Sequence, residues 1–388
     1  MRIALMGSRG VPATYGGFET AAEQIGRRLA ERGHEITVYC RHDGPREYLG
    51  MRRVQVPAIR RRTLETLSHT CASCAHACVW RPDVAIVFNA ANAPLLPLLK
   101  LRRIPVAVHV DGLEWRRGKW SDAGRRYYLR MEGLAVAWAD ALIADADAIA
   151  DYYLAKFGVE ATVLRYGAPV LTRPFLNRLA ELGLRPGQYH LVVARIEPEN
   201  HIEVIAEGYR DSAVRHPLVV VGGNVYATDY TRRVERLLAA DNRIVAPGAI
   251  YDQDLLDALY AGCLTYSHGH SVGGTNPSLL RAMGAGAAVL AMNNRFNREV
   301  LGPTGRFFDS SADLAHLFET AEADPAATAA AGRSAQTRAA AAYDWDEVAL
   351  GYEALCRRLA SRPGIRAALR MARDQTDPAW SPLDVTRP

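Results

Sequence analysis

Short apolar runs alternate with longer amphipathic segments from the start of the chain. Arg2–Met6 predicts a buried strand, the stretch from Gly7 to Gly17 predicts a loop, and residues 18–33 repeat apolar positions with the period of a helix. A second strand is predicted at Glu35–Cys40. This strand–loop–helix–strand opening is typical of a Rossmann-like half.

The alternation continues, pauses once, and then resumes. Residues 168–187 are rich in proline and glycine, which indicates a domain boundary. The later strands are predicted at Asp83–Phe88, Ile104–Val110, Ala141–Ala144, Thr162–Tyr166, His190–Ala194 and Leu218–Val221, with helices at Thr63–Trp80, after Pro94, and at Ser121–Trp138, Ala146–Phe157, His201–Tyr209 and Asp344–Leu359. The predicted fold class is α/β, with two doubly wound Rossmann-like domains facing across a cleft. The predicted parts are an N-terminal domain (1–167), a hinge (168–187), a C-terminal domain (188–343), a final helix (344–362) and a tail (363–388).

The most informative stretch runs from Cys263 to Met292. A short strand leads into the polar loop His268–Thr275, which carries three glycines. Asn276 is a good N-cap and Pro277 suits the first helical position. A helix N-terminus behind a glycine loop offers free N–H groups to an anion. Gly274–Asn276 are therefore candidates for binding a diphosphate, and an ordinary turn is the alternative.

Composition narrows the function classes. The 388 residues are 49% hydrophobic and 23% charged, with a net charge of +5. This excess could favour phosphorylated substrates or an anionic membrane surface, but it is too small to indicate nucleic-acid binding. The apolar run Ile3–Met6 is too short for a leader, and no stretch reaches 18 apolar residues, so we expect a cytoplasmic protein.

Two further classes, nicotinamide dehydrogenases and metal-binding proteins, are disfavoured. The glycines at positions 7, 10, 16 and 17 do not fit a dinucleotide fingerprint, and Arg41 stands where a ribose would need a carboxylate. Cys71, Cys74 and Cys78 lie at helical spacing on one face, where cysteine packs as a small hydrophobe. We expect core packing there and no metal.

Four motifs follow one another along the chain: GSRGVPATYGGFET, AVHVDGLEWRRGKW, VARIEPEN and GHSVGGTNPSLLRAM. Together they resemble retaining glycosyltransferases of family 4, most closely a rhamnosyltransferase-like bacterial branch. The resemblance covers about residues 1–360 and implies the GT-B architecture, with the donor held mainly by the C-terminal domain and the acceptor mainly by the N-terminal one. It also implies that the final helix crosses back and that no metal or other cofactor is needed. The Asp-x-Asp triplet from Asp145 to Asp147 is predicted to cap a helix.

The resemblance assigns candidate site residues. His109 and Arg195 are the catalytic candidates, since an arginine can make paired bonds to a leaving diphosphate. The donor-binding candidates are Gly16, Gly17, Asn200, Gly273, Gly274, Thr275, Asn276 and Arg281, and the acceptor-binding candidates are Asp111, Glu114, Trp115 and Lys119. For His109 the alternative is a purely structural role, and for Arg195 it is a surface salt bridge. The implied reaction retains configuration by front-face attack and needs no protein nucleophile.

Three positions depart from the family pattern. Gly273 and Arg281 stand where relatives carry glutamates, and Asn200 stands where they often carry a lysine. Arg281 could reach the diphosphate, contact a ribose as a donor, or pair with a carboxylate.

The leading hypothesis is a retaining glycosyltransferase that uses a nucleotide-diphosphate sugar, with polysaccharide or natural-product biosynthesis as its setting. The alternatives are a catalytically silent homologue that binds a nucleotide sugar or a partner enzyme, and a related phosphorylase or epimerase. The sugar, the nucleobase, the acceptor and the oligomeric state stay open, as does peripheral membrane contact.

Overall fold

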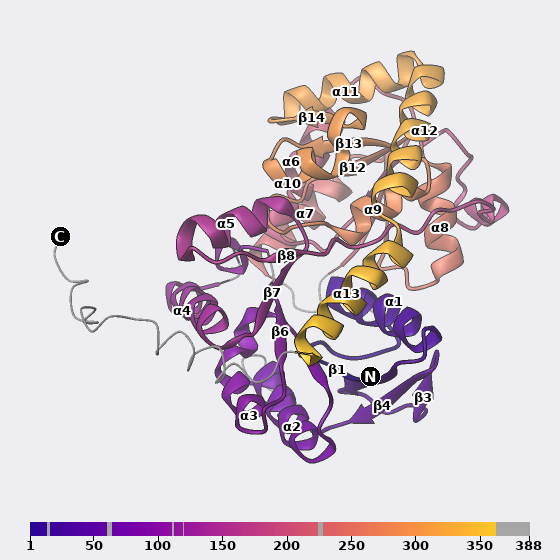
Figure 1. Cartoon of the computed structure of the whole chain (residues 1–388). Coiled ribbons are helices and arrows are strands. Elements are labelled where there is room, and N and C mark those ends of the chain that lie inside the picture. Colours follow the sequence, from indigo (N-terminus) through magenta and orange to yellow (C-terminus); the bar gives the residue numbers. More distant parts are fainter. Residues whose placement is uncertain (14–15, 60–63, 111, 119, 224–227, 362–388) are drawn as a thin grey trace.

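The computed structural model describes residues 1–13, 16–59, 64–110, 112–118, 120–223 and 228–361, which form two bodies built on separate sheets (Figure 1). The strands of the first sheet are β1 (Arg2–Met6), β2 (Glu35–Cys40), β3 (Glu47–Tyr48), β4 (Met51–Gln55), β5 (Val84–Phe88), β6 (Val106–His109), β7 (Ala141–Ala144) and β8 (Thr162–Val163). Those of the second are β9 (His190–Val193), β10 (Leu218–Val221), β11 (Ile244–Gly248), β12 (Thr265–His268), β13 (Ala288–Met292) and β14 (Arg306–Phe308). The strand orders are β3-β4-β2-β1-β5-β6-β7-β8 and β11-β10-β9-β12-β13-β14.

Helices connect the strands and cover both sheets. They are α1 (Gly17–Glu31), α2 (Glu65–Trp80), α3 (Leu96–Leu101), α4 (Asp122–Trp138), α5 (Asp147–Phe157), α6 (Ile202–Asp211), α7 (Asp229–Ala239), α8 (Gln253–Gly262), α9 (Pro277–Gly284), α10 (Arg295–Leu301), α11 (Ser311–Ala323), α12 (Pro325–Ala342) and α13 (Trp345–Ala360). Short 3-10 turns are η1 (Ala90–Leu95), η2 (Glu114–Arg116), η3 (Leu176–Leu182), η4 (Pro198–Asn200) and η5 (Gly302–Thr304). None of the described helices is long and apolar enough to span a bilayer.

The predicted fold class is confirmed: both sheets are parallel apart from the β3–β4 pair. The first sheet ends with β8 and the second begins with β9, so the predicted hinge, residues 168–187, lies between them. The sequence did not predict the β3–β4 hairpin, because MRRVQ has two arginines and no clear alternation. It also gave no elements for residues 293–343, where β14 and three helices lie. The predicted tail, 363–388, lies outside the described residues.

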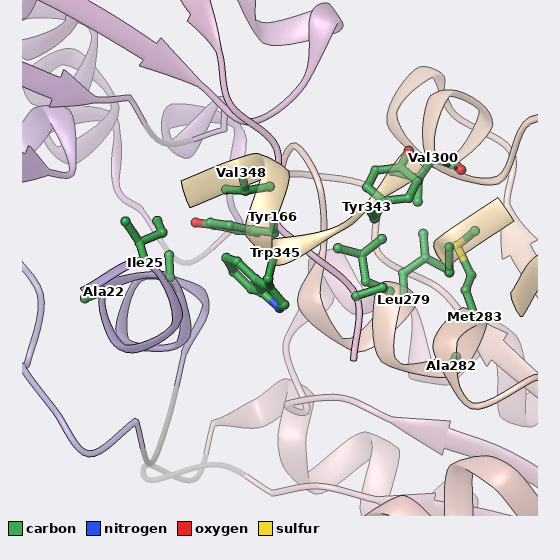
Figure 2. Packing of buried hydrophobic residues seen from close by; sticks show 14 of the residues in the cluster. Ala22, Ile25, Tyr166, Leu279, Ala282, Met283, Val300, Tyr343, Trp345 and Val348 are labelled. Carbon is green, nitrogen blue, oxygen red and sulfur yellow. Dashed lines mark hydrogen bonds between the residues drawn. The ribbon is translucent and has the colours of Figure 1, made fainter. Parts of the chain in front are cut away.

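The final helix joins the two bodies. α13 runs from the C-terminal domain down beside α1 (Figure 1), and Arg28 of α1 binds Asp346 of α13 at 2.7 Å. Figure 2 shows Trp345 of α13 between Ile25 of α1 and Leu279 of α9, all of them in one buried cluster. Because burial of large apolar side chains dominates packing energy, this cluster fixes how the carboxyl ends of the two sheets meet.

Candidate active site at the domain junction

Two helices, one from each domain, begin beside each other. α9 begins at Pro277, and Asn276 caps it by accepting the backbone N–H of Ser278 at 3.0 Å, as the sequence predicts. α1 begins at Gly17, and its N-cap, Gly16, provides no side-chain cap. A Cβ atom at Gly17 would lie 3.4 Å from Cγ of Pro277. Free N–H groups from two N-termini therefore gather at the junction, which favours an anion there.

Carboxylates of α1 hold the loop that precedes it. Oε1 of Glu19 accepts the backbone N–H of Arg9 at 2.8 Å, and Oε2 of Glu23 accepts that of Ala13 at 2.7 Å. Gly16 has a φ of +114°, and a Cβ atom there would lie 2.4 Å from Oε2 of Glu19. Glycine is therefore required at this position for both conformation and space.

The glycine loop before α9 touches the N-terminal domain. A Cβ atom at Gly112 would lie 2.5 Å from Cα of Gly273, and one at Gly274 would lie 1.8 Å from Oδ1 of Asp145. The Thr275 hydroxyl donates to the backbone carbonyl of Asp145 at 2.5 Å. Direct contact thus closes the predicted cleft at this point, and the loop has room for backbone alone.

His109 ends β6 inside an aromatic box. Its ring is fully buried, and its centroid lies 5.3, 5.5 and 5.8 Å from the rings of Phe18, Phe88 and Tyr166. Neither ring nitrogen makes a hydrogen bond within the described residues, and burial lowers the pKa of His109 to about 4. Its backbone carbonyl accepts the N–H of Asn89 at 3.0 Å. The neutral ring is therefore the group that remains for a ligand.

Arg195 follows β9 and is partly exposed. Its guanidinium binds Oε1 of Glu197 at 2.9 Å. The buried Asn200 amide donates to the Arg195 carbonyl at 2.8 Å, and a Cβ atom at Gly269 would lie 2.2 Å from the Asn200 carbonyl. Asn200 thus shapes the turn that carries Arg195 and seats it against the glycine loop.

An ion pair that the sequence analysis missed bridges the domains. Arg117 of the N-terminal domain lies 3.5 Å from Oε1 of Glu199 and 2.5 Å from Oε2 of Glu114. The Glu199 carbonyl accepts the N–H and hydroxyl of Ser271 at 2.9 and 3.2 Å. Arg117 and Glu199 both stand in motifs that carry the family resemblance, which is the signal that could have identified them.

Solved structures share this two-domain fold. Sucrose-phosphate synthase from Thermosynechococcus elongatus has a TM-score of 0.80 and 20% identity, over 92% of this chain and 98% of that one. Anabaena HepE in complex with UDP-glucose has a TM-score of 0.76 and 18% identity, over 92% and 99%. A trehalose-phosphate synthase (UDP-forming) from Burkholderia vietnamiensis has a TM-score of 0.69 and 12% identity, over 92% and 99%. At these identities the likeness establishes the fold alone.

The sequence adds a family match to this fold. Residues 16–167 match the glycosyl transferase 4-like domain. The N-terminal domain is therefore glycosyl transferase 4-like, and the chain has the GT-B fold. No curated protein sequence matches it. The matched span includes Gly16, Gly17 and His109, so the N-terminal side of the junction lies within the match.

Two stacked histidines lie at the start of the glycine loop. The rings of His268 and His270 lie 4.3 Å apart at 10°, and burial lowers the pKa of His268 to about 3 and that of His270 well below its usual value. The His270 carbonyl accepts the side-chain amides of Asn294 and Asn297 at 2.9 and 3.0 Å. The sequence analysis did not assign these two histidines, which burial keeps uncharged near pH 7.

Arg281 forms an ion pair with Asp257 of α8. The two side chains are 24% and 22% exposed, and Nε2 of Gln253 also donates to Asp257 at 3.0 Å. Of the three arrangements considered for Arg281, the structure therefore has the carboxylate pair.

The acceptor candidates divide into two groups. Glu114 is buried and accepts the indole N–H of Trp120 at 3.2 Å in addition to its contact with Arg117. Trp115 is half-buried against the N-terminal core, with the Arg116 guanidinium 5.2 Å from its ring centroid. Asp111 and Lys119 lie outside the described residues.

The predicted cap at the Asp-x-Asp triplet was wrong. Ala146, between Asp145 and Asp147, is the N-cap of α5, and no side chain of the triplet caps the helix. Instead Glu299 of α10 accepts the N–H groups of Asp147 and Ala148 at 2.7 and 3.1 Å. A cap contributed by another domain leaves no local sequence pattern.

The cysteines of α2 only partly match the expected packing. Cys74 is buried with its sulfur 3.8 Å from Sδ of Met6, whereas Cys78 lies at 3.3 Å from the Leu98 carbonyl and Cys71 is exposed. Within the residues that the structure describes, no group of three or more histidine, cysteine or acidic side chains is arranged to hold a metal.

Proposed function

We propose that this chain is a retaining glycosyltransferase that moves a sugar from a nucleotide-diphosphate donor to an acceptor bound at the domain junction. The main support is the meeting of two helix N-termini at Gly17 and Pro277, with Arg195 on the same edge of the C-terminal sheet. Fixed N–H dipoles and a guanidinium stabilise the charge that develops on a leaving diphosphate. In this proposal they supply the positive charge without a metal.

The reaction proceeds on one face of the sugar. The bond from the anomeric carbon to the diphosphate oxygen breaks while an acceptor oxygen, or a thiol sulfur, forms a new bond from the same side. The acceptor proton passes to the departing phosphate oxygen, so no protein nucleophile takes part. Configuration at the anomeric carbon is thereby retained.

His109 would donate a ring N–H to a hydroxyl of the donor sugar. The ring stays neutral near pH 7, which suits a hydrogen-bond donor better than an acid catalyst. Since the ring is buried between Phe18 and Tyr166, the sugar reaches it only when these side chains move apart. Gly17, next to Phe18, gives α1 the space for this approach.

UDP sugars are natural first probes, because HepE, with the same fold, was solved with UDP-glucose. The first test is thermal-shift screening against UDP, dTDP and GDP, since a ligand that binds the native state raises its stability. We expect at least one nucleotide to raise Tm, with an increase that grows with the logarithm of its concentration above Kd. If no nucleotide changes Tm at millimolar concentration, the proposal fails.

A catalytically silent nucleotide-sugar binder is the second candidate. It is favoured by the Arg281–Asp257 pair, which occupies a position where family 4 relatives carry a glutamate. Slow hydrolysis of the bound donor distinguishes the two, because an enzyme releases nucleotide diphosphate and a silent homologue does not. Acceptors to be screened are saccharides, lipid-linked saccharides and small natural products, including thiols. The proposed setting is the bacterial cytoplasm, in polysaccharide or natural-product biosynthesis.

A further inference from the structure

An apolar patch lies on the outer layer of the N-terminal domain, far from the motifs. Val79 and Leu101 are 82% and 79% exposed, more than any other large hydrophobic side chain in the described part of the chain. They end α2 and α3, which are held together here: the Cys78 thiol lies 3.3 Å from the Leu98 carbonyl, and Arg102 donates to the Cys78 carbonyl at 3.1 Å. Leu98, 36% exposed, adds to the same surface. We call these three aliphatic residues the α2–α3 patch.

Exposed arginines directly follow the two helices that carry the α2–α3 patch. Arg81 follows α2, and Arg102 and Arg103 follow α3. None of the three forms an ion pair with another described residue. Arginine after a helix can be explained by the helix dipole alone, but that effect does not account for the exposed aliphatic side chains between them.

The neighbouring carboxylates are already engaged. Asp140 binds Lys100 at 2.5 Å and also accepts the backbone N–H of Val106 at 2.9 Å. Asp83 lies 3.6 Å from the Arg2 guanidinium. The charges of Asp140 and Asp83 are therefore neutralised by Lys100 and Arg2. The charges of the three arginines remain as an excess of positive charge next to the α2–α3 patch.

We propose that this face of the N-terminal domain docks on an anionic lipid bilayer. The α2–α3 patch would enter the boundary between headgroups and acyl chains, while Arg81, Arg102 and Arg103 bind lipid phosphates. Apolar insertion and cationic attraction are the two terms by which proteins bind such surfaces reversibly. Each arginine near an anionic surface contributes about a fivefold gain in binding.

A bilayer suits this surface better than a protein partner does. Stable protein interfaces bury roughly 800 Å² on each side and use aromatic anchors at their centre. The α2–α3 patch has three aliphatic side chains and no aromatic one, whereas arginines with unpaired charge match a fluid anionic surface without a fixed complementary geometry.

The position of the patch leaves the site accessible. α2 and α3 lie on the part of the N-terminal domain that is remote from the C-terminal domain (Figure 1). The chain leaves β5 and β6 at their carboxyl ends near the junction, and Leu101 and Arg103 come shortly before β6 begins. Docking through this face would hold the protein at a membrane without covering the junction, whichever reaction occurs there.

The test is flotation of the full chain with vesicles of phosphatidylcholine alone or with 30% phosphatidylglycerol, at low and high salt. We expect flotation with the anionic vesicles only, and a loss of at least tenfold for V79S/L101S and for R81Q/R102Q/R103Q. The matched controls are L154S, at an exposed leucine of α5, and R236Q, at an exposed arginine of α7. Circular dichroism and Tm show that each variant is folded.

Three results would overturn the proposal. One is equal flotation of the patch variants and the wild type, and another is equal binding to neutral and anionic vesicles. The third is no flotation, together with self-association that V79S/L101S abolishes in size-exclusion chromatography; the patch would then be a protein contact. None of these results depends on glycosyl transfer.

Discussion

Oε1 of Glu299, in the C-terminal domain, accepts the first backbone N–H of α5 from Asp147, in the N-terminal domain, at 2.7 Å. Oε2 of the same carboxylate accepts the next N–H, from Ala148, at 3.1 Å, and the Arg165 guanidinium lies 3.4 Å from Oε1. A carboxylate at a helix N-terminus satisfies free donors and opposes the positive end of the dipole. One side chain thus caps a helix and ties two domains together.

Replacing Glu299 by alanine should therefore weaken both functions. We expect Glu299→Ala to lower the free energy of unfolding by about 0.5–2 kcal/mol, the usual effect of losing an N-cap. Glu299→Gln, which keeps an acceptor without the charge, should lose less. Urea denaturation measures the change, with Glu235→Ala on exposed α7 as the control. Equal stability of all four proteins would show that the cap contributes nothing.

The cap also marks what a sequence can predict. Asn276 and Pro277 were predicted as a helix start because both signals are adjacent in the chain. Glu299 stands about 150 positions after Asp147, so no local pattern connects them. The alternation of strands and helices predicted two Rossmann-like sheets, whereas β4 (MRRVQ) was missed because its sequence lacks the alternation of apolar and polar residues, although it pairs with both β2 and β3.

Arg195→Ala should impair the reaction. A guanidinium that binds a leaving diphosphate acts mainly in the transition state. We therefore expect kcat/KM to fall, by an amount that corresponds to a rise of roughly 2–4 kcal/mol in activation free energy. Removing the Glu197 carboxylate alone, by Glu197→Gln, should break this ion pair and cost much less. Steady-state kinetics with a donor found by the nucleotide screen measure both. Wild-type kinetics of a folded Arg195→Ala protein would assign this arginine to the surface pair with Glu197.

His109→Ala should separate turnover from binding. Since the neutral ring would contact the sugar and not the nucleotide, we expect kcat to fall at least tenfold while the Kd for the nucleotide diphosphate changes little. Calorimetric titration with the nucleotide and turnover assays with the nucleotide sugar test the two parts. His316→Ala, at an exposed position on α11, is the control. An unchanged kcat would make His109 a purely structural residue.

Buried neutral histidines predict a loss of stability in mild acid. Burial lowers the pKa of His109 to about 4 and that of His268 to about 3, whereas an unfolded histidine titrates near 6.5. As pH falls below about 6.5, the unfolded chain binds protons that the folded chain does not, so stability decreases toward pH 4. Each such histidine contributes up to about 1.4 kcal/mol per pH unit. Urea unfolding at pH 7, 6 and 5 should show a shallower decrease for His268→Gln than for His316→Gln. Parallel curves would contradict this.

The site was predicted in part, for physical reasons that differ between residues. His109, Arg195 and the glycine loop all stand at the carboxyl ends of parallel strands, where ligands bind in such folds, and the structure gathers them at one junction. Arg117 and Glu199 were missed because their pairing depends on how the two domains meet. That arrangement is set by buried side chains of α13, which lie more than 140 residues further along the chain.

The last prediction tests whether Arg281 belongs to the donor-binding site or only pairs with Asp257. Its ion pair with Asp257 is partly exposed, so by itself it contributes about 0–1 kcal/mol to stability. In the family that this chain resembles, a glutamate at this position would accept ribose hydroxyls, and a guanidinium has no acceptor atoms.

Arg281→Glu alone would place two carboxylates, those of the new glutamate and Asp257, next to each other. The double variant R281E/D257N removes that repulsion and restores an acceptor. We expect it to bind UDP more tightly relative to dTDP, by roughly five- to tenfold if one ribose hydrogen bond is regained. D257N alone is the control, and calorimetric titration measures the ratio of the two affinities. If that ratio is the same in the wild type, D257N and R281E/D257N, Arg281 lies outside the donor site and the pair with Asp257 is its whole role.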